Sequence, residues 1–411
     1  MSKRTYLMLS VIALASIVFT ACGGGAAAPA TGGTIKVVSD LPMTGSSLGQ
    51  TQTIVNGITQ AFEATGNKVC GGKWQIQYEA HDDASAALGK WDPDVVTANA
   101  KQYAADSSIV AVIGTFNSGA AKLMIPILNP ESLVIISPAN TYPGLTKPGK
   151  GEADEPGKYF PSGTPNYTRV VPADDLQGAV GANWAKDLGA TSVYILDDQE
   201  LYGKGLADVF DASAKEIGLT VLGHEGIDGK AADYKALATK VNELNPDLIY
   251  FGGITQNNAG QLWKDIRNVG YAGMLMGPDG IYEGAFLEAA GDAAEGTYLT
   301  FGGVPPSELQ GAAATWRDSY KAKFGSDPEV YTVYGYVAGS MLVDAFERVC
   351  TAGGSPTDRK TVRDAVFATK DFDSVLGKFS IDANGDTTIT TMSGSVVENG
   401  EFVFSSLLGG G

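Results

Sequence analysis

The stretch Ile109–Gly119, with the sequence IVAVIGTFNSG, joins a run of five apolar residues to a run of small and polar ones. An apolar run without polar alternation is typical of a strand buried on both faces of a sheet. Ser118 is suited to open a following helix, because its hydroxyl can accept from the free amides of the first turn. In open α/β sheets, ligands bind just beyond the carboxyl ends of the strands. The stretch therefore predicts a buried strand, a helix start and a binding segment between them.

The same pattern recurs along the chain from Thr34 onward. Further apolar runs are Ile35–Val38, Leu133–Ile136, Val193–Leu196, Leu248–Phe251, Met274–Met276 and Thr297–Phe301. Helical patterns lie between them, over Thr53–Ala64, Val95–Ala105, Leu176–Leu188, Gly205–Ile217, Tyr234–Leu244, Gln261–Val269, Ala312–Phe324 and Val333–Val349. Such alternation predicts βαβ units, parallel sheets and helices on both faces. The strands are too many for one doubly wound domain, so we expect an α/β fold of two doubly wound lobes.

The last part of the chain departs from this alternation. Three short alternating runs after Leu376 predict an antiparallel meander; they are Lys378–Ile381, Thr387–Met392 and Phe402–Ser405. Asn384-Gly385 and Asn399-Gly400 are the turn signals between them. The segment Gly144–Thr164 is rich in Pro, Gly and charged residues, and it predicts an exposed insertion or a loop between the lobes.

Composition excludes several classes of function. The chain has 411 residues with 29 Lys+Arg against 46 Asp+Glu, a formal charge of −17. Phosphate binding needs clustered basic residues, so a nucleic-acid partner is not expected. Two histidines leave little room for a His-based metal site or triad. The 53 glycines, about 13% against a usual ~7%, are assigned to the N-terminal tether, the strand ends, and helix ends and hairpins.

The first 22 residues have the features of a secretion signal. Lys3 and Arg4 precede an apolar run, Tyr6–Phe19, that is short for a membrane span. The run leads into Cys22, and this junction resembles a bacterial lipobox, in which the cysteine is lipidated and becomes the first mature residue. We therefore expect a signal peptide over 1–21, and a lipidated Cys22 with a flexible tether over 22–33. A signal that is cleaved elsewhere, with an incidental Cys22, is the alternative.

The other two cysteines predict a disulfide. With Cys22 assigned to lipid, Cys70 and Cys350 remain as a pair in an oxidising compartment. Two buried thiols are the alternative. No later stretch is long and apolar enough to span a bilayer, so the body of the chain is expected outside the cytoplasmic membrane.

The residues after the predicted strands form the candidate site. They are rich in hydroxyls, amides and small residues, with carboxylates among them, and helix N-termini nearby would add free amides. The segments are Gly114–Gly119, Ser137–Thr141, Asp197–Gly203, Gly252–Thr255 and Gly277–Gly280. This set suits hydrogen bonding to a small zwitterion better than it suits bond breaking.

These segments resemble a known family. Val112–Gly119, Ile135–Thr141, Tyr202–Gly205, Met276–Gly280 and Ala289–Gly296 look like the leucine/isoleucine/valine-binding proteins. Those are type I periplasmic solute-binding proteins of ABC transporters, and the similarity is collinear from about Thr34 to Phe404. The order and spacing of the motifs are specific, although each motif alone is weak. The resemblance implies an extracytoplasmic binding protein that uses no cofactor and no metal.

The resemblance also assigns roles to residues. Ser118, flanked by Asn117 and Gly119, matches the serine that receives the ligand carboxylate together with helix amides. Ala139 and Thr141 match positions that bind through a backbone carbonyl and a hydroxyl. Two further matches come from the second lobe: Tyr202 as a closing aromatic and Asp279 as the partner of the α-ammonium. One match comes from the first helix: Gln50 at the side-chain pocket. General physics agrees, since an anion is stabilised at a helix N-terminus and a carboxylate binds an ammonium.

Three departures from the family pattern leave the ligand open. Asp279 stands where the family usually has a glutamate, one methylene longer. Gln50 stands where an aromatic often caps the pocket, and the insertion Gly144–Thr164 is longer than the usual connection. Isoleucine, a polar amino acid, an amide or a small carboxylate all remain possible ligands.

The expected lobes are discontinuous in sequence. Lobe 1 comprises 34–168 and 306–375, and lobe 2 comprises 172–301 and 378–408. Hinge crossovers are expected near 169–171, 302–305 and 376–377. A ligand would bind lobe 1, and lobe 2 would then close over it. The closed monomer would deliver the ligand to the transmembrane subunits of an ABC permease, with the membrane contacted only through the lipid anchor.

Two other functions are alternatives to transport. A ligand sensor of the same fold would close in the same way but report to a receptor or regulator. The segment Gly45–Gly49 matches G-x-S-x-G, so Ser47 with His81 or His224 could be read as a secreted serine hydrolase. That match lies in a Gly/Ser-rich loop where chance matches are common, and we expect no enzyme. Asp382–Asp386 imitates a calcium loop but lacks the Gly and Glu that such a loop needs, and it predicts a hairpin turn.

Overall fold

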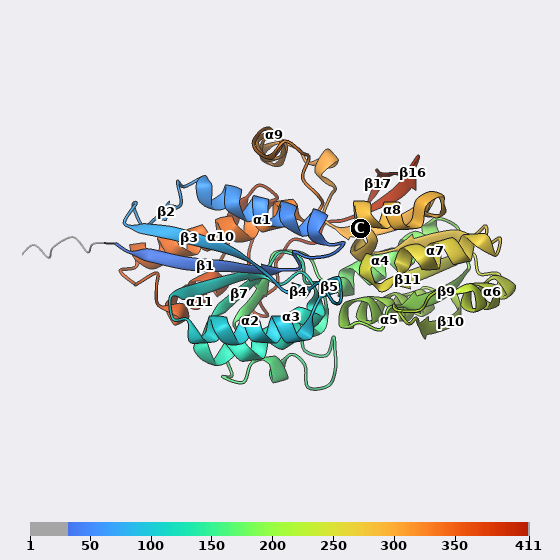
Figure 1. Ribbon diagram of the computed structural model, residues 1–411, viewed down its shortest axis with the longest axis horizontal. Helices are drawn as coiled ribbons and strands as arrows, with labels where there is room; N and C mark the ends of the chain where they lie inside the picture. The colour runs from blue at the N-terminus through green and yellow to red at the C-terminus, as the bar shows by residue number, and fades with distance from the viewer. Residues whose placement is uncertain (1–31, 410–411) are drawn as a thin grey trace, which may run out of the picture.

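The computed structural model describes residues 32–409. Two α/β halves lie side by side along the longest axis, each with its own sheet (Figure 1). The predicted signal peptide, the lipidation site Cys22 and nearly all of the tether lie outside the described residues. The predicted α/β fold with two mostly parallel sheets is confirmed.

The first sheet has six strands in the order β2-β3-β1-β6-β7-β8. The strands are β1 (Thr34–Leu41), β2 (Lys68–Val69), β3 (Trp74–Asp82), β6 (Ile109–Gly114), β7 (Val134–Ser137) and β8 (Tyr167–Arg169). All neighbours pair in parallel except β2, which is antiparallel to β3. Every residue of β6 and β7 is buried. This burial on both faces explains their uninterrupted apolar runs.

Helices from two separate parts of the chain cover this sheet. The early ones are α1 (Leu48–Glu63), α2 (Pro93–Ala105) and α3 (Ser118–Leu128), and the late ones are α9 (Ala312–Phe324), α10 (Thr332–Thr351) and α11 (Arg359–Phe367). Helix α1 packs along α10. A methyl group on Gly57 would lie only 2.4 Å from the carbonyl oxygen of Thr332, so a glycine is needed where the two helices touch.

The second sheet has seven strands in the order β10-β9-β11-β12-β13-β16-β17. They are β9 (Ser192–Asp197), β10 (Thr220–Gly226), β11 (Leu248–Gly252), β12 (Met274–Gly277), β13 (Thr297–Gly302), β16 (Met392–Glu398) and β17 (Glu401–Leu408). The first five are parallel, and β16 and β17 join antiparallel at one edge. The helices of this half are α4 (Asp174–Asp187), α5 (Leu201–Glu216), α6 (Lys235–Leu244), α7 (Ala259–Asn268) and α8 (Gly284–Ala290).

The chain passes three times between the two halves. It leaves the first sheet after β8, returns after β13 to form α9 to α11, and leaves again before β16. Two small hairpins complete the fold: β4 (Ala84–Ser85) with β5 (Lys90–Trp91), and β14 (Phe372–Ser374) with β15 (Gly377–Phe379).

The predicted three-stranded meander is wrong in part. Residues 378–379 pair with β14, and 387–391 form no strand. The segment before β16 runs beside the end of β8 instead of forming a meander strand. Asp386 lies beside Arg169, and the Arg169 amide donates to the carbonyl oxygen of Gly385 at 3.0 Å. Asn399-Gly400 does join β16 to β17, and both residues have the positive φ that such a two-residue turn needs. Helix α3 was predicted only by its start at Ser118. Helices α8 and α11 and strands β2, β3, β4, β5, β8, β10 and β14 were missing from the predicted elements.

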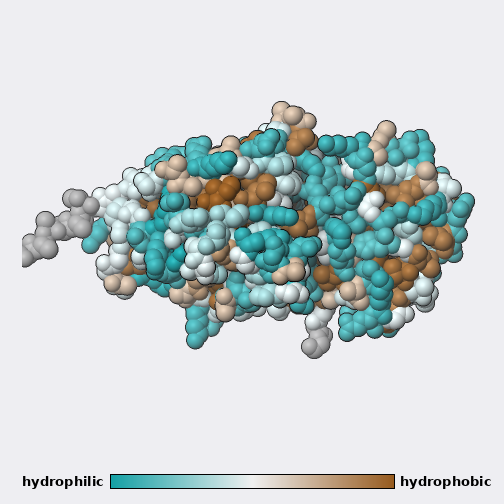
Figure 2. Space-filling view, turned by 90° about the horizontal axis from the view of Figure 1, so that it is seen from below, coloured by the Kyte–Doolittle hydropathy of each residue, from teal (hydrophilic) through white to brown (hydrophobic). Residues whose placement is uncertain are grey.

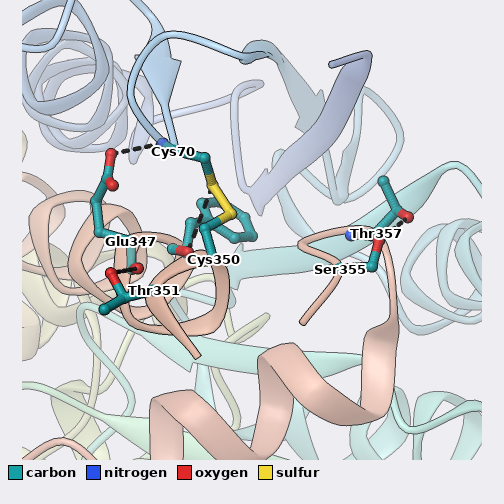
Figure 3. Close-up of a disulfide and its surroundings, with 7 residues drawn as sticks. Cys70, Glu347, Cys350, Thr351, Ser355 and Thr357 are labelled. Atoms are coloured by element: carbon teal, nitrogen blue, oxygen red, sulfur yellow. Dashed lines mark hydrogen bonds between the residues drawn. A yellow bond between two sulfur atoms is a disulfide. The ribbon is translucent and has the colours of Figure 1, made fainter. Parts of the chain in front are cut away.

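Cys70 and Cys350 form a disulfide, with Cα atoms 5.6 Å apart (Figure 3). The bond joins the turn between β2 and β3 to the last turn of α10. The backbone amide of Cys70 also donates to the Glu347 carboxylate at 2.6 Å. The disulfide therefore holds an early and a late part of the chain together within the first half.

The surface shows no single large apolar face among the described residues in view. Hydrophobic and hydrophilic side chains are interspersed over both halves (Figure 2). Large apolar side chains that are well exposed are spread over several segments, with two of them on β17; they are Leu48, Leu88, Leu222, Leu244, Val403 and Leu407. None of the helices within the described range combines the length and apolar character needed to cross a membrane.

Candidate functional site

A small cavity with a volume of about 20 Å³ lies between the two halves. Its lining comes from both halves and comprises Phe116, Asn117, Ser118, Ala139, Tyr202, Ile254, Asp279, Gly280 and Tyr331. Most of these residues follow the carboxyl ends of β6, β7, β11 and β12. The cavity therefore occupies the place where parallel α/β sheets bind ligands.

The first wall is the N-terminus of α3. Asn117 is the N-cap residue, and its carbonyl oxygen accepts from the amides of Ala120 and Ala121 at 3.1 and 3.2 Å. Ser118 is the first helical residue, one position later than its predicted capping role, and its Oγ accepts from the Tyr142 amide at 3.3 Å. The first amides of a helix have no intrahelical partner and carry a partial positive charge. This wall suits an anionic group.

The opposite wall carries one buried carboxylate, Asp279, two residues after the end of β12. Its Oδ1 accepts from Tyr202 Oη at 2.9 Å and from Gln177 Nε2 at 2.5 Å, and its Oδ2 accepts from Tyr331 Oη. Burial raises the pKa of Asp279, although the hydrogen bonds from Tyr331, Gln177 and Tyr202 act in the opposite direction. A carboxylate in such a place gains most from a cationic partner.

A second buried carboxylate lies behind the first. Asp174, the first residue of α4, is fully buried, and neither of its oxygens has a well-formed hydrogen bond. Burial and then the nearby charge of Asp279 raise the pKa of Asp174 well above its ordinary value. Thr141 lies beside it: the Asp174 amide donates to the Thr141 carbonyl at 2.9 Å, and the Thr141 hydroxyl is buried without a well-formed bond. A second negative charge is therefore unfavourable on this side of the cavity, and a cationic group placed there would be stabilised by either carboxylate.

Five of the eight predicted ligand-binding residues line the cavity: Asn117, Ser118, Ala139, Tyr202 and Asp279. Thr141, Gly119 and Gln50 do not. Thr141 is buried next to Asp174, as described above. Gly119 lies under the indole of Trp91, which would be 2.6 Å from a methyl group at this glycine. Gln50 is buried in α1, and its Nε2 has no hydrogen-bond partner.

Four cavity residues were not named from the sequence as ligand contacts: Phe116, Ile254, Gly280 and Tyr331. Tyr331 directly precedes the long apolar helix α10, a position typical of a core aromatic. It is indeed fully buried, but its hydroxyl reaches Asp279, and its ring packs edge-on against Phe116 at 5.6 Å. The positions of Phe116 and Ile254, each two residues after a strand, were the available signal.

Arg169 is a further residue that the sequence did not single out. It is fully buried at the end of β8 and donates to the carbonyl oxygens of Asn140 and Tyr142 at 3.2 and 2.9 Å. Its Nε also pairs with Asp386 Oδ1 at 2.6 Å. Arg169 therefore fixes the backbone of the loop that carries Ala139.

The residues of the hydrolase interpretation are not assembled. Ser47 is buried just before α1, where its carbonyl oxygen accepts from Thr51. His81 pairs with Glu79 at 3.4 Å, and His224 lies 3.2 Å from Asp197 and 3.4 Å from Asp211. Across residues 32–409, no three His, Cys, Asp or Glu side chains are placed to hold a metal ion.

The arrangement is that of a ligand-binding protein: two α/β halves, three crossings, and a cavity between the halves with an anion-binding wall and a carboxylate wall. The family model described as periplasmic binding protein matches residues 34–401, and the chain belongs to that family.

Two individual proteins are similar enough in sequence to support this placement. The Leu/Ile/Val-binding protein homolog 2 of Brucella abortus (strain 2308) is 30% identical over 368 residues, 88% of this chain and 91% of the relative. The crystal structure of the leucine binding protein LivK of Thermotoga maritima superposes with a TM-score of 0.78 at 26% identity, covering 91% of this chain and 98% of that one.

A third protein is similar in fold. The branched-chain amino acid substrate binding protein LivJ of Streptococcus pneumoniae, in complex with isoleucine, gives a TM-score of 0.75 at 22% identity, covering 91% of this chain and 98% of that one.

Proposed function

We propose that this protein binds an amino acid, branched-chain or a related small zwitterion, and delivers it to the transmembrane subunits of an ABC importer. One observation carries the proposal: the same cavity has the N-terminus of α3 on one wall and the buried carboxylate of Asp279 on the other. A zwitterion presents one charge to each wall.

The relatives support the choice of ligand class. One is named a Leu/Ile/Val-binding protein homolog and another a leucine binding protein, and both extend over most of this chain. The apolar part of the lining, Phe116, Ile254 and Tyr331, offers a surface for an aliphatic side chain. Asp279 is shorter than the glutamate usual in the family, and this change supports a search beyond leucine, isoleucine and valine.

The proposed mechanism is closure of two lobes. Lobe 1 comprises 34–168 and 306–375, lobe 2 comprises 172–301 and 378–408, and the chain bends near 169–171, 302–305 and 376–377. The positions of the three crossings between the sheets support these limits. Ser118 and Ala139 meet the ligand from lobe 1, and Tyr202 and Asp279 meet it from lobe 2. A ligand that contacts both lobes raises the closed population.

The proposed location is the outer face of a membrane. A periplasmic binding protein works outside the cytoplasm, and we propose that a lipid on Cys22 anchors this one as a monomer near its permease. Tethering raises the effective concentration of the binder at its partner.

A thermal-shift screen with matched analogues tests the function. L-leucine, L-isoleucine and L-valine are compared with 4-methylpentanoate, which lacks the ammonium of leucine, and with isopentylamine, which lacks its carboxylate. A ligand at 100 times its Kd adds about 2.7 kcal/mol to the stability. We expect only compounds with both charges to raise the melting temperature. If compounds without an ammonium are the ones that stabilise the protein, Asp279 does not have the role given to it.

A further inference from the structure

The small hairpin of β4 and β5 stands at the boundary between the two halves (Figure 1). It is fixed to the first half at its base. The Asp83 amide donates to the carbonyl oxygen of Leu41 at 3.1 Å, and the Asp92 amide donates to that of Asp83 at 2.8 Å. Asp92 also caps α2 through the Asp94 amide at 2.9 Å. The hairpin therefore moves with the first half.

Two side chains of this hairpin reach the second half. Lys90 Nζ pairs with Glu200 Oε1 and donates to Asn257 Oδ1 at 2.6 Å. Trp91 Nε1 donates to Glu200 Oε2 at 2.9 Å. Both oxygens of one carboxylate thus receive donors from the hairpin. The side chains of Lys90 and Glu200 are each only 19% exposed, so water screens this pair less than an ordinary surface pair.

The second half holds Glu200 in place for this contact. The Glu200 amide donates to Asp198 Oδ1 at 3.0 Å. Asn257 Nδ2 donates to Asp198 Oδ2 at 2.7 Å and to Glu200 Oε1 at 3.0 Å. Glu200 immediately precedes α5, yet its side chain makes no capping bond to that helix. Its carboxylate instead accepts hydrogen bonds from the hairpin of the first half.

The contact borders the cavity without lining it. On the first half, the Trp91 ring covers Gly119, next to the cavity residue Ser118. On the second half, Glu200 lies two residues before Tyr202. Asp198 accepts from the amide of the cavity residue Ile254 at 3.1 Å. Formation of the contact therefore requires the two cavity walls to be together, whichever ligand lies between them.

We propose that Lys90, Trp91 and Glu200 form a latch that stabilises the closed protein directly, with Asn257 as a positioning residue for Glu200. The proposal rests on the proposed closure. Because the latch exists only in the closed form, it raises the closed fraction without touching the ligand. Affinity rises in proportion to the fraction of binding-competent protein, and slower opening lengthens the residence time. The latch thus raises the affinity for every ligand by the same factor, while the cavity contacts distinguish one ligand from another.

The first experiment needs no ligand. Spin labels at Lys101→Cys on α2 and Lys264→Cys on α7, both exposed, report the distance between the halves by pulsed electron resonance. We expect a short-distance population in the ligand-free protein that falls in Glu200→Gln and in Lys90→Met. Asp208→Asn is the control: it also removes a carboxylate from α5, but Asp208 pairs within that helix, with Lys204. Distance distributions that are identical in all variants would overturn the latch.

The second experiment measures L-leucine binding and release by stopped flow. Glu200→Gln should raise koff and Kd by about tenfold with little change in kon. Combined with Lys90→Met it should add little, because the two residues act through one contact. The same factor should apply to L-isoleucine, since the latch contacts no ligand. An effect that differs strongly between ligands, or full additivity, would assign Glu200 another role.

The proposed function and the proposed latch can be refuted independently of each other. If the unaltered protein binds no amino acid, the proposed function is wrong, while the ligand-free distances still decide the latch. A fold defect is excluded by unchanged melting temperatures of the ligand-free variants.

Discussion

At the scale of single residues, the proposed ligand binding depends most on Asp279. It is buried, accepts three hydrogen bonds, and faces a helix N-terminus across the cavity. We predict that Asp279→Ala weakens amino-acid binding by about 2–5 kcal/mol, the cost of removing one partner of a buried charge pair. Isothermal calorimetry measures the loss. Asp292→Asn, at an exposed position of the same half, should leave the affinity unchanged. Equal affinity in Asp279→Ala would refute the assignment.

Asp83 gives a residue-scale prediction about pH. It is fully buried beside Asp40, and neither of its oxygens has a hydrogen bond. Burial and the charge of Asp40 raise the pKa of Asp83, and burial raises the pKa of Asp40 to about 7. The folded pair thus keeps a proton that the unfolded chain has released above about pH 4, and stability falls as pH rises from there towards 7.

Asp83→Asn removes this titration. We expect it to stabilise the protein by about 1–3 kcal/mol near pH 8 and by less near pH 5. Urea unfolding at the two pH values measures the difference, with the exposed Glu243→Gln as control. A variant that is less stable near pH 8 would show that the Asp83 carboxylate has a stabilising partner.

Site residues could be identified from the sequence only where a suitable side chain also followed the end of a predicted strand. Ser118, Ala139 and Asp279 are small or polar and follow a strand end, so their motifs pointed to the cavity. Tyr331 could not be separated from the core, because a buried aromatic at a helix start has the same pattern whether its hydroxyl meets solvent, backbone or Asp279. The contact between Gly119 and Trp91 could not be predicted, because Trp91 belongs to a hairpin that no pattern predicted.

At the scale of elements, periodicity located helices whose apolar stripe is continuous. The pattern over Ala312–Phe324 matches α9 at both ends. The extent of helix α3 beyond its predicted start was missed because Ser118–Leu128 is small and apolar nearly all round and contains Pro126. Strand β3 was missed because Trp74–Asp82 is half exposed and mixes polar with apolar residues. A periodic sequence pattern reflects which side chains are buried, so helices and strands with an unusual burial cannot be recognised from it.

The disulfide makes an element-scale prediction. It joins the β2–β3 turn to α10 across a sequence separation of 280 residues. Replacing both Cys70 and Cys350 by serine should lower the stability by about 2–5 kcal/mol, chiefly because the unfolded chain gains freedom. Denaturant unfolding measures the loss. Reductant should destabilise the unaltered protein and leave the double variant unchanged, and a double variant of full stability would contradict the prediction.

At the scale of the whole molecule, the fold class followed from strand–helix alternation, whereas the contacts between the crossing segments did not. Arg169 and Asp386 are 217 residues apart, and no local pattern links them. In the structure they form a buried ion pair at 2.6 Å where the first and third crossings meet. Burial would raise the pKa of Asp386, but Arg169, Lys147 and Thr146 together lower it below its ordinary value. The stability that the pair contributes is therefore present above about pH 4 and is lost as pH falls through the lowered pKa.

Removing one charge of this ion pair should destabilise the protein more than removing both charges. Arg169→Met leaves a buried carboxylate without its main partner, and we expect a loss of about 3–5 kcal/mol. Arg169→Met with Asp386→Leu removes both charges, so its loss should be clearly smaller than the sum of the two single losses. The carbonyl oxygens of Asn140 and Tyr142 still lose their donor, which prevents full recovery. Urea unfolding of the four proteins forms the cycle, and strict additivity would show that the two residues stabilise the crossings independently.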